Sequence, residues 1–164
     1  MPSASVAVTG SLVPASQTLR LTSTAFAEGG SIPRKYSCDG ANVSPPLAWD
    51  GVPGDAMALV VIVDDPDASG FVHWVAFDIP VAPNGELQEG ASAADPGLLQ
   101  GTNGFGKVGW GGPCPPSGTH HYRFRLLAIR TALGLSGAPT AVAVLAAAKD
   151  KTLGEATLTA RYKR

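Results

Sequence analysis

The chain has 164 residues, a formal net charge of -1, 45% hydrophobic and 15% charged residues. This length suits one domain that buries roughly 70% of its unfolded surface, and the composition excludes a disordered chain. The basic residues are scattered, which excludes a dense nucleic-acid-binding face, so no nucleic acid partner is expected. The longest apolar runs, 56–63 and 141–148, fall short of the ~20 residues that a membrane helix needs, and no transmembrane segment is predicted.

The first eighteen residues, 1–18, are predicted to form a flexible arm ahead of a single domain over 19–164. They mix Ser, Ala, Val, Thr and Pro, with no positive charge before Arg20. A secretory signal needs a basic start and a continuous apolar segment, so a cytoplasmic location is the default expectation. In that compartment two cysteines are more often free thiols than a disulfide. Sequence alone does not bring Cys38 and Cys114 together.

The element pattern indicates a loop-rich, largely β protein, with 20 Gly and 14 Pro residues. Runs of β-forming residues between Gly, Pro and Asp turns predict strands over 19–23, 46–49, 57–63, 71–79, 121–130 and 156–162. A helix is predicted over 140–151, because Thr140 can cap its start, alanines favour it, and Gly154 lies just past its end. The stretch 85–106 is predicted to be an excursion with at most a short helical turn.

Two segments gather the polar residues that could form a site. In the first, Asp64-Asp65-Pro66-Asp67 precedes His73-Trp74, and in the second a Gly/Pro-rich loop leads from Gly111 to His120-His121-Tyr122. Side chains alternate along a strand. This alternation predicts two sets that share a face: His120, Tyr122, Phe124 and Leu126 on one strand, and Phe71, His73, Val75 and Phe77 on the other. One such histidine is more often a satisfied core residue, but two beside polar loops favour a functional pocket.

The pocket candidates supply hydrogen-bond donors, acceptors and groups that titrate near neutral pH: Asp65, Asp67, His73, His120 and Tyr122. An aspartate beside an imidazole fixes its tautomer, so the pair can hold a phosphate or carboxylate oxygen. Trp74 and Trp110 are predicted to add apolar walls. A nucleophile and base formed by Cys114 and His120 is disfavoured, because Pro113 and Pro115 fix the backbone around the thiol.

The chain is identified as a member of the phosphatidylethanolamine-binding protein family by motifs spread over nearly its whole length. They are Ala25-Phe26 through Gly29-Gly30, 32–40, 42–47, the two segments above, Phe105-Gly106, and 153–156 with the tail ending at Tyr162. It is most similar to the bacterial, Raf kinase inhibitor-like branch of small single-domain members. The resemblance implies a mainly β fold, with a large antiparallel sheet packed against a smaller one and one or two short helices.

The resemblance also implies roles for particular residues. An anion-binding pocket for phosphate-like groups, phosphoethanolamine headgroups and small carboxylates would be lined by Asp65, His73, His120 and Tyr122. Matching positions at its rim are Asp67, Ala68, Pro113 and Pro115. Some relatives regulate a partner enzyme such as a kinase or a protease, and a homodimer stays open as a further alternative.

Two departures from the family pattern stand near the pocket. Family members usually have a proline where Ser69 stands, so Ser69-Gly70 is expected to loosen the rim. They also have an arginine where His121 stands, and alternation directs His121 away from His120. Eukaryotic members carry a C-terminal helix that helps cover the pocket, whereas this sequence ends in a predicted strand.

Three functional hypotheses follow. The favoured one is a non-catalytic protein that binds a small anionic or phosphorylated ligand, because no activated nucleophile, Gly-x-Ser-x-Gly elbow or nucleotide-binding loop occurs. The second is an enzyme that uses Asp65, His73 and His120 as acid and base in an isomerisation, dehydration or cyclisation. The third is a metal site on the same three residues, which is disfavoured because no short His-x-x-x-His unit occurs. No cofactor and no metal are expected.

Overall fold

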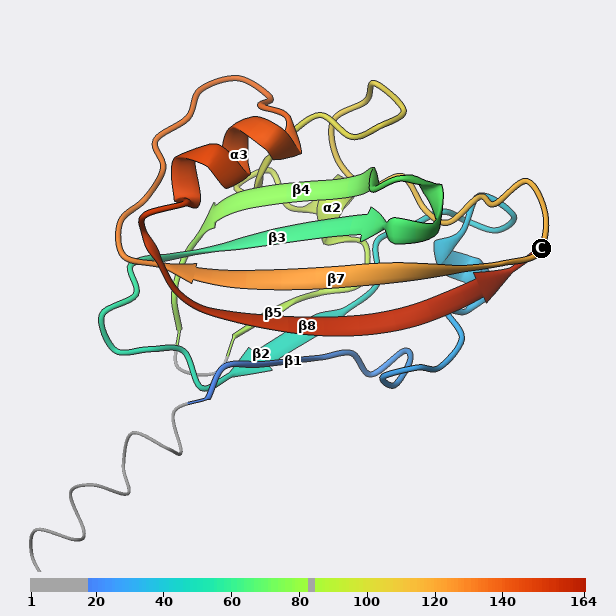
Figure 1. Ribbon diagram of the computed structural model, residues 1–164, viewed down its shortest axis with the longest axis horizontal. Coiled ribbons are helices and arrows are strands. Elements are labelled where there is room, and N and C mark those ends of the chain that lie inside the picture. The colour runs from blue at the N-terminus through green and yellow to red at the C-terminus, as the bar shows by residue number, and fades with distance from the viewer. Residues whose placement is uncertain (1–17, 83–84) are drawn as a thin grey trace, which may run out of the picture.

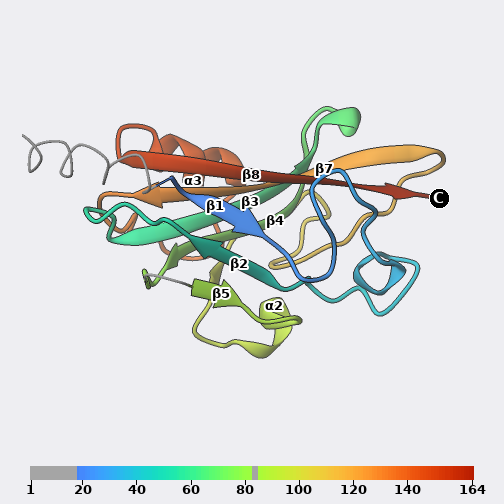
Figure 2. The same ribbon diagram turned by 90° about the horizontal axis from the view of Figure 1, so that it is seen from below.

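The computed structural model describes residues 18–82 and 85–164. The predicted arm lies outside the described residues, apart from Thr18. Within the described ranges the fold is mainly β, with two antiparallel sheets and few, short helices (Figures 1 and 2). The larger sheet has the strand order β6-β4-β3-β7-β8 and the smaller one the order β1-β2-β5. This arrangement confirms the fold class predicted from the sequence.

The strands are β1 (Arg20–Thr22), β2 (Leu47–Asp50), β3 (Ala58–Asp65), β4 (Phe71–Ile79), β5 (Gly85–Leu87), β6 (Leu99–Gln100), β7 (Thr119–Ile129) and β8 (Thr152–Lys163). The helices are α2 (Ala91–Ala94) and α3 (Ala141–Ala148), and two 3-10 turns are η2 (Arg34–Tyr36) and η3 (Pro66–Ala68). All six predicted strands are present. The sequence missed β5 and β6, which are short and lie in the stretch 85–106, where few periodic apolar residues occur.

The predicted helix forms, with a shorter span than expected. Thr140 caps its start, where the side-chain oxygen accepts a hydrogen bond from the N–H of Ala143 at 3.2 Å. Val144 and the small residues Ala141 and Ala148 are buried against the sheet, so the alanines allow close packing. A three-residue turn, 149–151, leads from the helix into β8, and Gly154 lies inside that strand and not in the turn after the helix.

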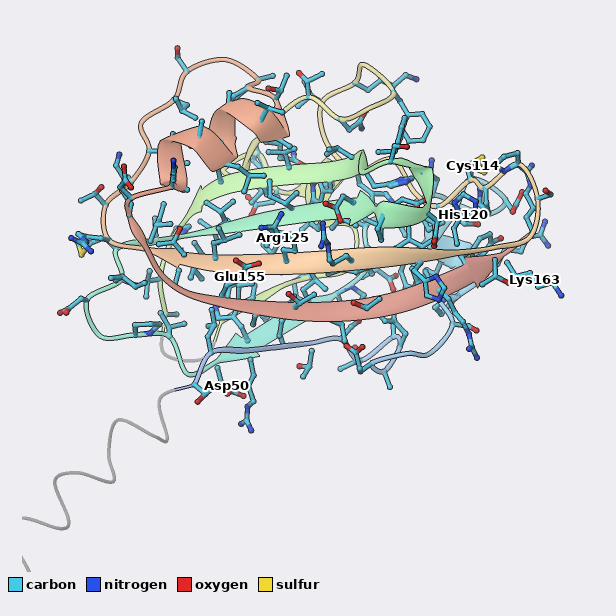
Figure 3. The ribbon with its side chains drawn as sticks, viewed as in Figure 1. Asp50, Cys114, His120, Arg125, Glu155 and Lys163 are labelled. Carbon is cyan, nitrogen blue, oxygen red and sulfur yellow. A yellow bond between two sulfur atoms is a disulfide. The ribbon has the colours of Figure 1, made fainter. Side chains whose placement is uncertain are left out.

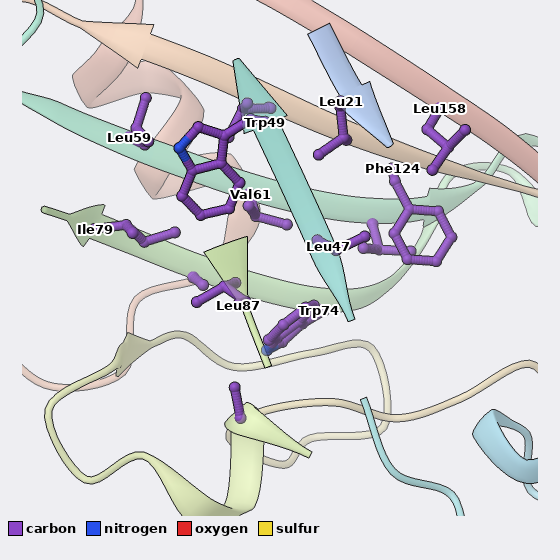
Figure 4. Packing of buried hydrophobic residues seen from close by; sticks show 14 of the residues in the cluster. Leu21, Leu47, Trp49, Leu59, Val61, Trp74, Ile79, Leu87, Phe124 and Leu158 are labelled. Atoms are coloured by element: carbon purple, nitrogen blue, oxygen red, sulfur yellow. The ribbon is translucent and has the colours of Figure 1, made fainter. Parts of the chain in front are cut away.

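Strand β3 lies at the centre of the larger sheet, and all of its residues are buried because both of its faces are covered. Leu59 and Val61 belong to the core between the two sheets, together with Trp74 (Figure 4). Val63 belongs to the same cluster. The alternate residues of β3 pack with Val144 of α3 in a second cluster. The unbroken apolar run of β3 in the sequence thus reflects burial on both faces.

A β-bulge in β4 changes the face on which His73 lies. Val63 is paired with Trp74 and the next residue, Asp64, with Val72, so His73 is an extra residue on β4. Bulges of this kind re-aim a side chain and often lie next to functional sites. The prediction of one shared face along β4 is therefore wrong. Val75 and Phe77 pack towards α3, whereas the His73 ring lies 5.1 Å from that of Tyr122, which belongs to the inter-sheet core.

Candidate functional site

A pocket of about 200 Å³ opens where β3 ends and β4 and β7 begin. It is lined by Asp65, Ala68, Phe71, His73, Phe105, Cys114, Pro115, Pro116, His120 and Tyr122. Figure 3 shows Cys114 and His120 at the same end of the larger sheet as Lys163. The pocket therefore combines residues from three strands with Ala68 of η3 and with residues of the long connection between β6 and β7.

Asp65 and His120 form the polar centre of the pocket. Oδ2 of Asp65 lies 2.6 Å from Nδ1 of His120, and Oδ1 accepts a hydrogen bond from the N–H of Asp67 at 2.8 Å. The side chains are 4% and 19% exposed, so the pair is largely shielded from water. Because a carboxylate only accepts hydrogen bonds, Nδ1 of His120 carries a proton. The pair fixes the orientation of the imidazole and leaves Nε2 available to a ligand.

Both the side chain and the backbone of His73 form hydrogen bonds with the backbone of Gly111. Its Nδ1 lies 2.6 Å from the Gly111 carbonyl oxygen, and the N–H of Gly111 donates to the His73 carbonyl at 2.9 Å. The carbonyl can only accept, which places the proton on Nδ1. Burial lowers the pKa of His73, while the Gly111 carbonyl and the charge of Asp65 act in the opposite direction. The imidazole is therefore neutral near pH 7, with Nε2 as an acceptor.

The hydroxyl of Tyr122 is the third polar group of the pocket. Within the described ranges, neither the Tyr122 hydroxyl nor His73 Nε2 has a hydrogen-bond partner. Both residues line the cavity, and over the same ranges the one unpartnered side-chain nitrogen or oxygen that is sealed from solvent is Trp49 Nε1. The Tyr122 hydroxyl and His73 Nε2 are therefore reachable from the cavity. Burial, followed by the charges of Asp65 and Asp67, raises the pKa of Tyr122 far above its usual value. The hydroxyl thus remains a neutral donor.

The rim formed by η3 is held more firmly than the sequence suggested. Ser69 has a φ of 57° and Gly70 a φ of 78°, and the N–H of Gly70 donates to the Asp65 carbonyl at 2.9 Å. Proline cannot replace Ser69 in this conformation, because its ring fixes φ near about -65°. Ser69 therefore stands in place of the family's proline in a left-handed turn, and the hydrogen bond from Gly70 to Asp65 closes that turn.

Asp67 faces the outside of the sheet, away from the cavity. Its Oδ2 accepts hydrogen bonds from the backbone N–H and from Nδ1 of His121 at 2.7 and 2.8 Å. These bonds lower the pKa of Asp67. His121 points away from His120, as alternation predicted, and it anchors η3 to β7.

A disulfide bond joins Cys38 to Cys114 and fixes the proline-rich wall of the pocket. The N–H of Cys38 also donates to the carbonyl of Pro113 at 3.0 Å, so two links connect the loop after η2 to this wall. The expectation of free thiols is corrected by this bond. The two cysteines are 76 residues apart in the chain, and no spacing motif in the sequence relates them.

Aromatic rings form the apolar side of the pocket. The rings of Phe71 and Phe105 are 4.8 Å apart, and each contacts the imidazole of His73, at 5.1 and 5.7 Å. Phe105 lies directly against Gly111, where a Cβ atom would come within 2.5 Å of the ring. Because Gly111 has no side chain, the Phe105 ring can pack against the backbone that binds His73.

The structure brings six of the predicted site residues to the cavity: Asp65, Ala68, His73, Pro115, His120 and Tyr122. It places four elsewhere: Asp67, Trp74, Trp110 and Pro113. Trp74 is fully buried between the sheets, with Nε1 donating to Gln100 at 2.8 Å, and Trp110 donates to the Tyr36 carbonyl at 3.1 Å. Trp74 and Trp110 contact each other edge-on, Trp110 is partly buried against the inter-sheet core, and neither residue lines this cavity.

Four cavity residues were not among the predicted ligand contacts: Phe71, Phe105, Cys114 and Pro116. Alternation did place Phe71 beside His73, and the dipeptide Phe105-Gly106 was part of the family pattern. Among the described residues, no group of three or more His, Cys, Asp or Glu side chains could hold a metal ion. Over the same residues, no helix is long and apolar enough to cross a membrane.

Two packed antiparallel sheets, with an Asp–His pocket at one end and a proline-rich loop beside it, define a β-sandwich protein with a small-ligand-sized cavity. The chain belongs to the phosphatidylethanolamine-binding protein family, which matches residues 22–163. It is 48% identical to a UPF0098 protein of Methanothermobacter thermautotrophicus, an alignment that covers 89% of this chain and 99% of that protein.

Two further relatives support the assignment. The chain is 41% identical to the putative lipoprotein LppC of Mycobacterium tuberculosis, over 92% of this chain and 75% of that protein. The fold is similar to the crystal structure of a putative phosphatidylethanolamine-binding protein homologue from Chlamydia trachomatis. That likeness has a TM-score of 0.83 at 35% identity and covers 90% of this chain and 99% of the other.

Proposed function

We propose that this protein binds a small molecule through an anionic phosphate, phosphonate or carboxylate group in the pocket of Asp65 and His120. The observation that carries the proposal is the pair of unpartnered polar atoms, the Tyr122 hydroxyl and His73 Nε2, that open onto the cavity. Polar groups without a partner in an apolar surrounding cost free energy unless a ligand or water satisfies them. A bound group that carries both an ionised oxygen and an O–H, such as a phosphate monoanion, would satisfy both.

The hydrogen-bonding pattern favours a ligand that both accepts and donates. The Tyr122 hydroxyl donates to an oxyanion, whereas neutral His73 offers an acceptor at Nε2. A phosphate monoanion meets both demands with its P–O⁻ and P–OH groups. A fully ionised ligand brings no proton, so His73 must take one up before it can donate. Binding of an ionised oxyanion is therefore expected to be coupled to proton uptake and to weaken as the pH rises.

The size of the cavity limits the ligand to a small molecule. A cavity of about 150 Å³ in another protein holds benzene. The pocket, at about 200 Å³, has room for an anionic group and a few carbon atoms beside the Phe71 and Phe105 rings. An O-phosphorylethanolamine headgroup is of this size. If a partner enzyme is regulated, as the family resemblance suggests, occupancy of the pocket is the property on which that regulation would depend.

An NMR titration with phosphate and with O-phosphorylethanolamine tests the proposal. The imidazole signals of His73, His120 and His121 are followed between pH 5 and 8. We expect saturable shifts at His73 and His120 and none at His121, which lies outside the pocket beside Asp67. We also expect His73 to become harder to deprotonate when ligand is bound. Unchanged signals at all three histidines would reject anion binding.

An enzyme remains the second candidate, and one observation favours it. The Asp65–His120 pair lies in a pocket that is lined, apart from His73 and Tyr122, by apolar residues, an environment in which an imidazole can act as a general base through Nε2. The reaction class is proton transfer in an isomerisation, dehydration or cyclisation of a small organic acid. Incubation with such acids in D₂O, followed by mass spectrometry for deuterium incorporation, tests this candidate, and no incorporation would reject it.

The disulfide bears on where the protein works. Disulfides persist in oxidising compartments and are rare in the cytoplasm of mesophiles. The bond between Cys38 and Cys114 therefore weighs against the cytoplasmic expectation and supports a location outside the cytoplasm. The name of the lipoprotein relative points the same way for that protein. Rapid alkylation of the native protein in its own cells measures the free thiols, and complete labelling of both cysteines would restore the cytoplasmic expectation.

A further inference from the structure

A second hollow lies beside the pocket, and the two share a wall. It also has a volume of about 200 Å³ and is lined by Cys38, Asn42, Asn103, Phe105, Lys107, Trp110, Gly111, Gly112 and Cys114. Phe105 and Cys114 line both hollows. Sites for whole small-molecule ligands usually measure about 300–1,000 Å³. Each hollow alone is below that range, so a ligand of ordinary size would need both.

The second hollow carries a cation that has no ionic partner. Lys107 takes part in none of the ion pairs formed within the described residues. Its backbone is fixed by Asn103, whose side-chain oxygen accepts from the Lys107 N–H at 3.2 Å and whose own N–H donates to the Lys107 carbonyl at 2.8 Å. The start of this lysine side chain is thus held in place at the edge of the hollow.

An amide donor accompanies the cation. Oδ1 of Asn42 accepts a hydrogen bond from the N–H of Gly112 at 2.9 Å, which identifies the oxygen and turns the NH₂ group away from that bond. No acceptor for this NH₂ group is found in the part of the chain that the structure describes, and Asn42 is an exposed residue. An ammonium and an amide NH₂ group together suit a carboxylate or phosphate oxygen.

Phe105 and Cys114 form the divider between the two hollows. The Phe105 side chain is flanked by Gly104 and Gly106, and the residue is 47% exposed. Its ring packs edge-on against Phe71 and His73 on the first side. Its other neighbours include Gly111, which has no side chain to widen the barrier. A ligand that occupies both hollows would therefore place its connecting carbons over this ring.

We propose that the second hollow is a subsite for the second anionic group of a bifunctional ligand, a small molecule with a phosphate or phosphonate at one end and a carboxylate at the other. This inference rests on the proposed function of the first pocket. Lys107 and Asn42 hold the carboxylate, Tyr122 and His120 hold the phosphorus group, and the connecting carbons lie over Phe105. Lys107 is the residue that selects the bifunctional ligand over one with a single anionic end.

The test is a calorimetric comparison of two ligand series of equal length. One series is 3-phosphonopropionate, 4-phosphonobutyrate and 5-phosphonopentanoate, and the other is the alkylphosphonates with the same number of carbons but a methyl end. We expect at least one member of the first series to bind roughly tenfold more tightly than its methyl-ended match. Lys107→Gln should remove most of that advantage, and it should change alkylphosphonate affinity by less than about twofold, because an exposed charge acts weakly at a distance.

Lys149→Gln is the matched control, since it removes the same charge at the far end of β8. Lys149 precedes the start of β8, whereas His120 is paired with Tyr162 near its end. Equal binding of both series, with no effect of Lys107→Gln, would overturn the subsite and leave the anion pocket intact. Equal effects of the two lysine variants would also overturn it. If neither series binds, the proposed function fails, and the subsite fails with it.

Discussion

Asp65 and His120 are 55 residues apart in the chain, and yet Oδ2 of one lies 2.6 Å from Nδ1 of the other. The contact follows from the antiparallel pairing of β3 with β7, which places the end of β3 beside the start of β7. The motif that contains Asp65 also contains Asp67, whose side chain faces the outside of the sheet. Two carboxylates with nearly the same sequence context therefore have different surroundings, and they can be tested against each other.

We predict that Asp65→Asn weakens phosphate binding by roughly tenfold or more, in line with the loss of a charge-assisted hydrogen bond worth about 1.5–3 kcal/mol. The amide can offer either an acceptor or a donor to Nδ1 of His120, so the tautomer is no longer enforced. Asp67→Asn, the matched control, should change the affinity by less than about twofold. Isothermal titration calorimetry with phosphate measures both, and equal losses in the two variants would contradict the central role of Asp65.

His120→Ala should abolish phosphate binding with little loss of stability. The imidazole contributes a ligand contact at the pocket, and its side chain is partly exposed, so its removal leaves no large sealed cavity. His121→Ala is the control, because that imidazole lies on the opposite face of β7 and should leave phosphate affinity nearly unchanged. Chemical denaturation and calorimetry on the same samples separate the two effects. A His120→Ala variant that lost much stability would instead favour a structural histidine.

Trp74→Ala should act in the opposite way and mainly destabilise the fold. The ring is fully buried between the sheets and contacts Trp110 edge-on, with ring centres 5.7 Å apart. Truncation would leave a large cavity and remove the hydrogen bond to Gln100, so we expect a loss of about 3–5 kcal/mol in the free energy of unfolding. Trp74→Phe, which keeps most of the apolar volume, should lose less. Similar unfolding curves for the wild type and Trp74→Ala would refute this assignment.

The buried His73 predicts that stability falls in mild acid. Burial lowers the pKa of His73 below its ordinary value of 6.5, so between these two pKa values the unfolded chain binds more protons than the folded one. The stabilisation is complete above about pH 6.5 and is lost as the pH falls towards the folded-state pKa, by about 1.4 kcal/mol for each pKa unit of difference. Urea denaturation of the wild type and His73→Gln from pH 5 to 8 measures it. Parallel pH profiles would contradict the prediction.

The sequence predicted the strands and the central polar residues because both leave a local pattern. β4 was predicted with its observed bounds, and the alternation that joins His120 to Tyr122 holds along β7. The bulge at His73 was not predictable in this way, because a single extra residue arises from the pairing of β3 with β4 and leaves no local signal. The alternation rule placed His73 with Val75, and the bulge separates them.

The remaining differences concern contacts between distant loops. Trp74 and Trp110 were expected to form apolar walls of the pocket, but Trp74 is fully buried between the two sheets, and Trp110 is partly buried against that core and lines the second hollow instead. Phe105 lies between two glycines in a stretch without periodic apolar residues. No local pattern therefore indicated that its ring would reach the pocket. The pairing of Cys38 with Cys114 depends on the folding of two loops against each other, and nothing in their spacing indicates it.

The disulfide is predicted to support both the fold and the ligand pocket. Cys114 lines the pocket together with Pro115 and Pro116, whereas Cys38 lies outside it, so Cys38→Ser breaks the bond without changing the lining of the pocket. We expect a loss of about 2–5 kcal/mol in stability, and also weaker phosphate binding because the proline-rich wall is no longer tied to the loop after η2. Calorimetry of Cys38→Ser, and of wild type before and after reduction with dithiothreitol, measures the binding. A stability loss without any change in phosphate affinity would limit the disulfide to a purely stabilising role, whereas parallel losses in both samples would make the anion pocket sensitive to the redox state of its surroundings.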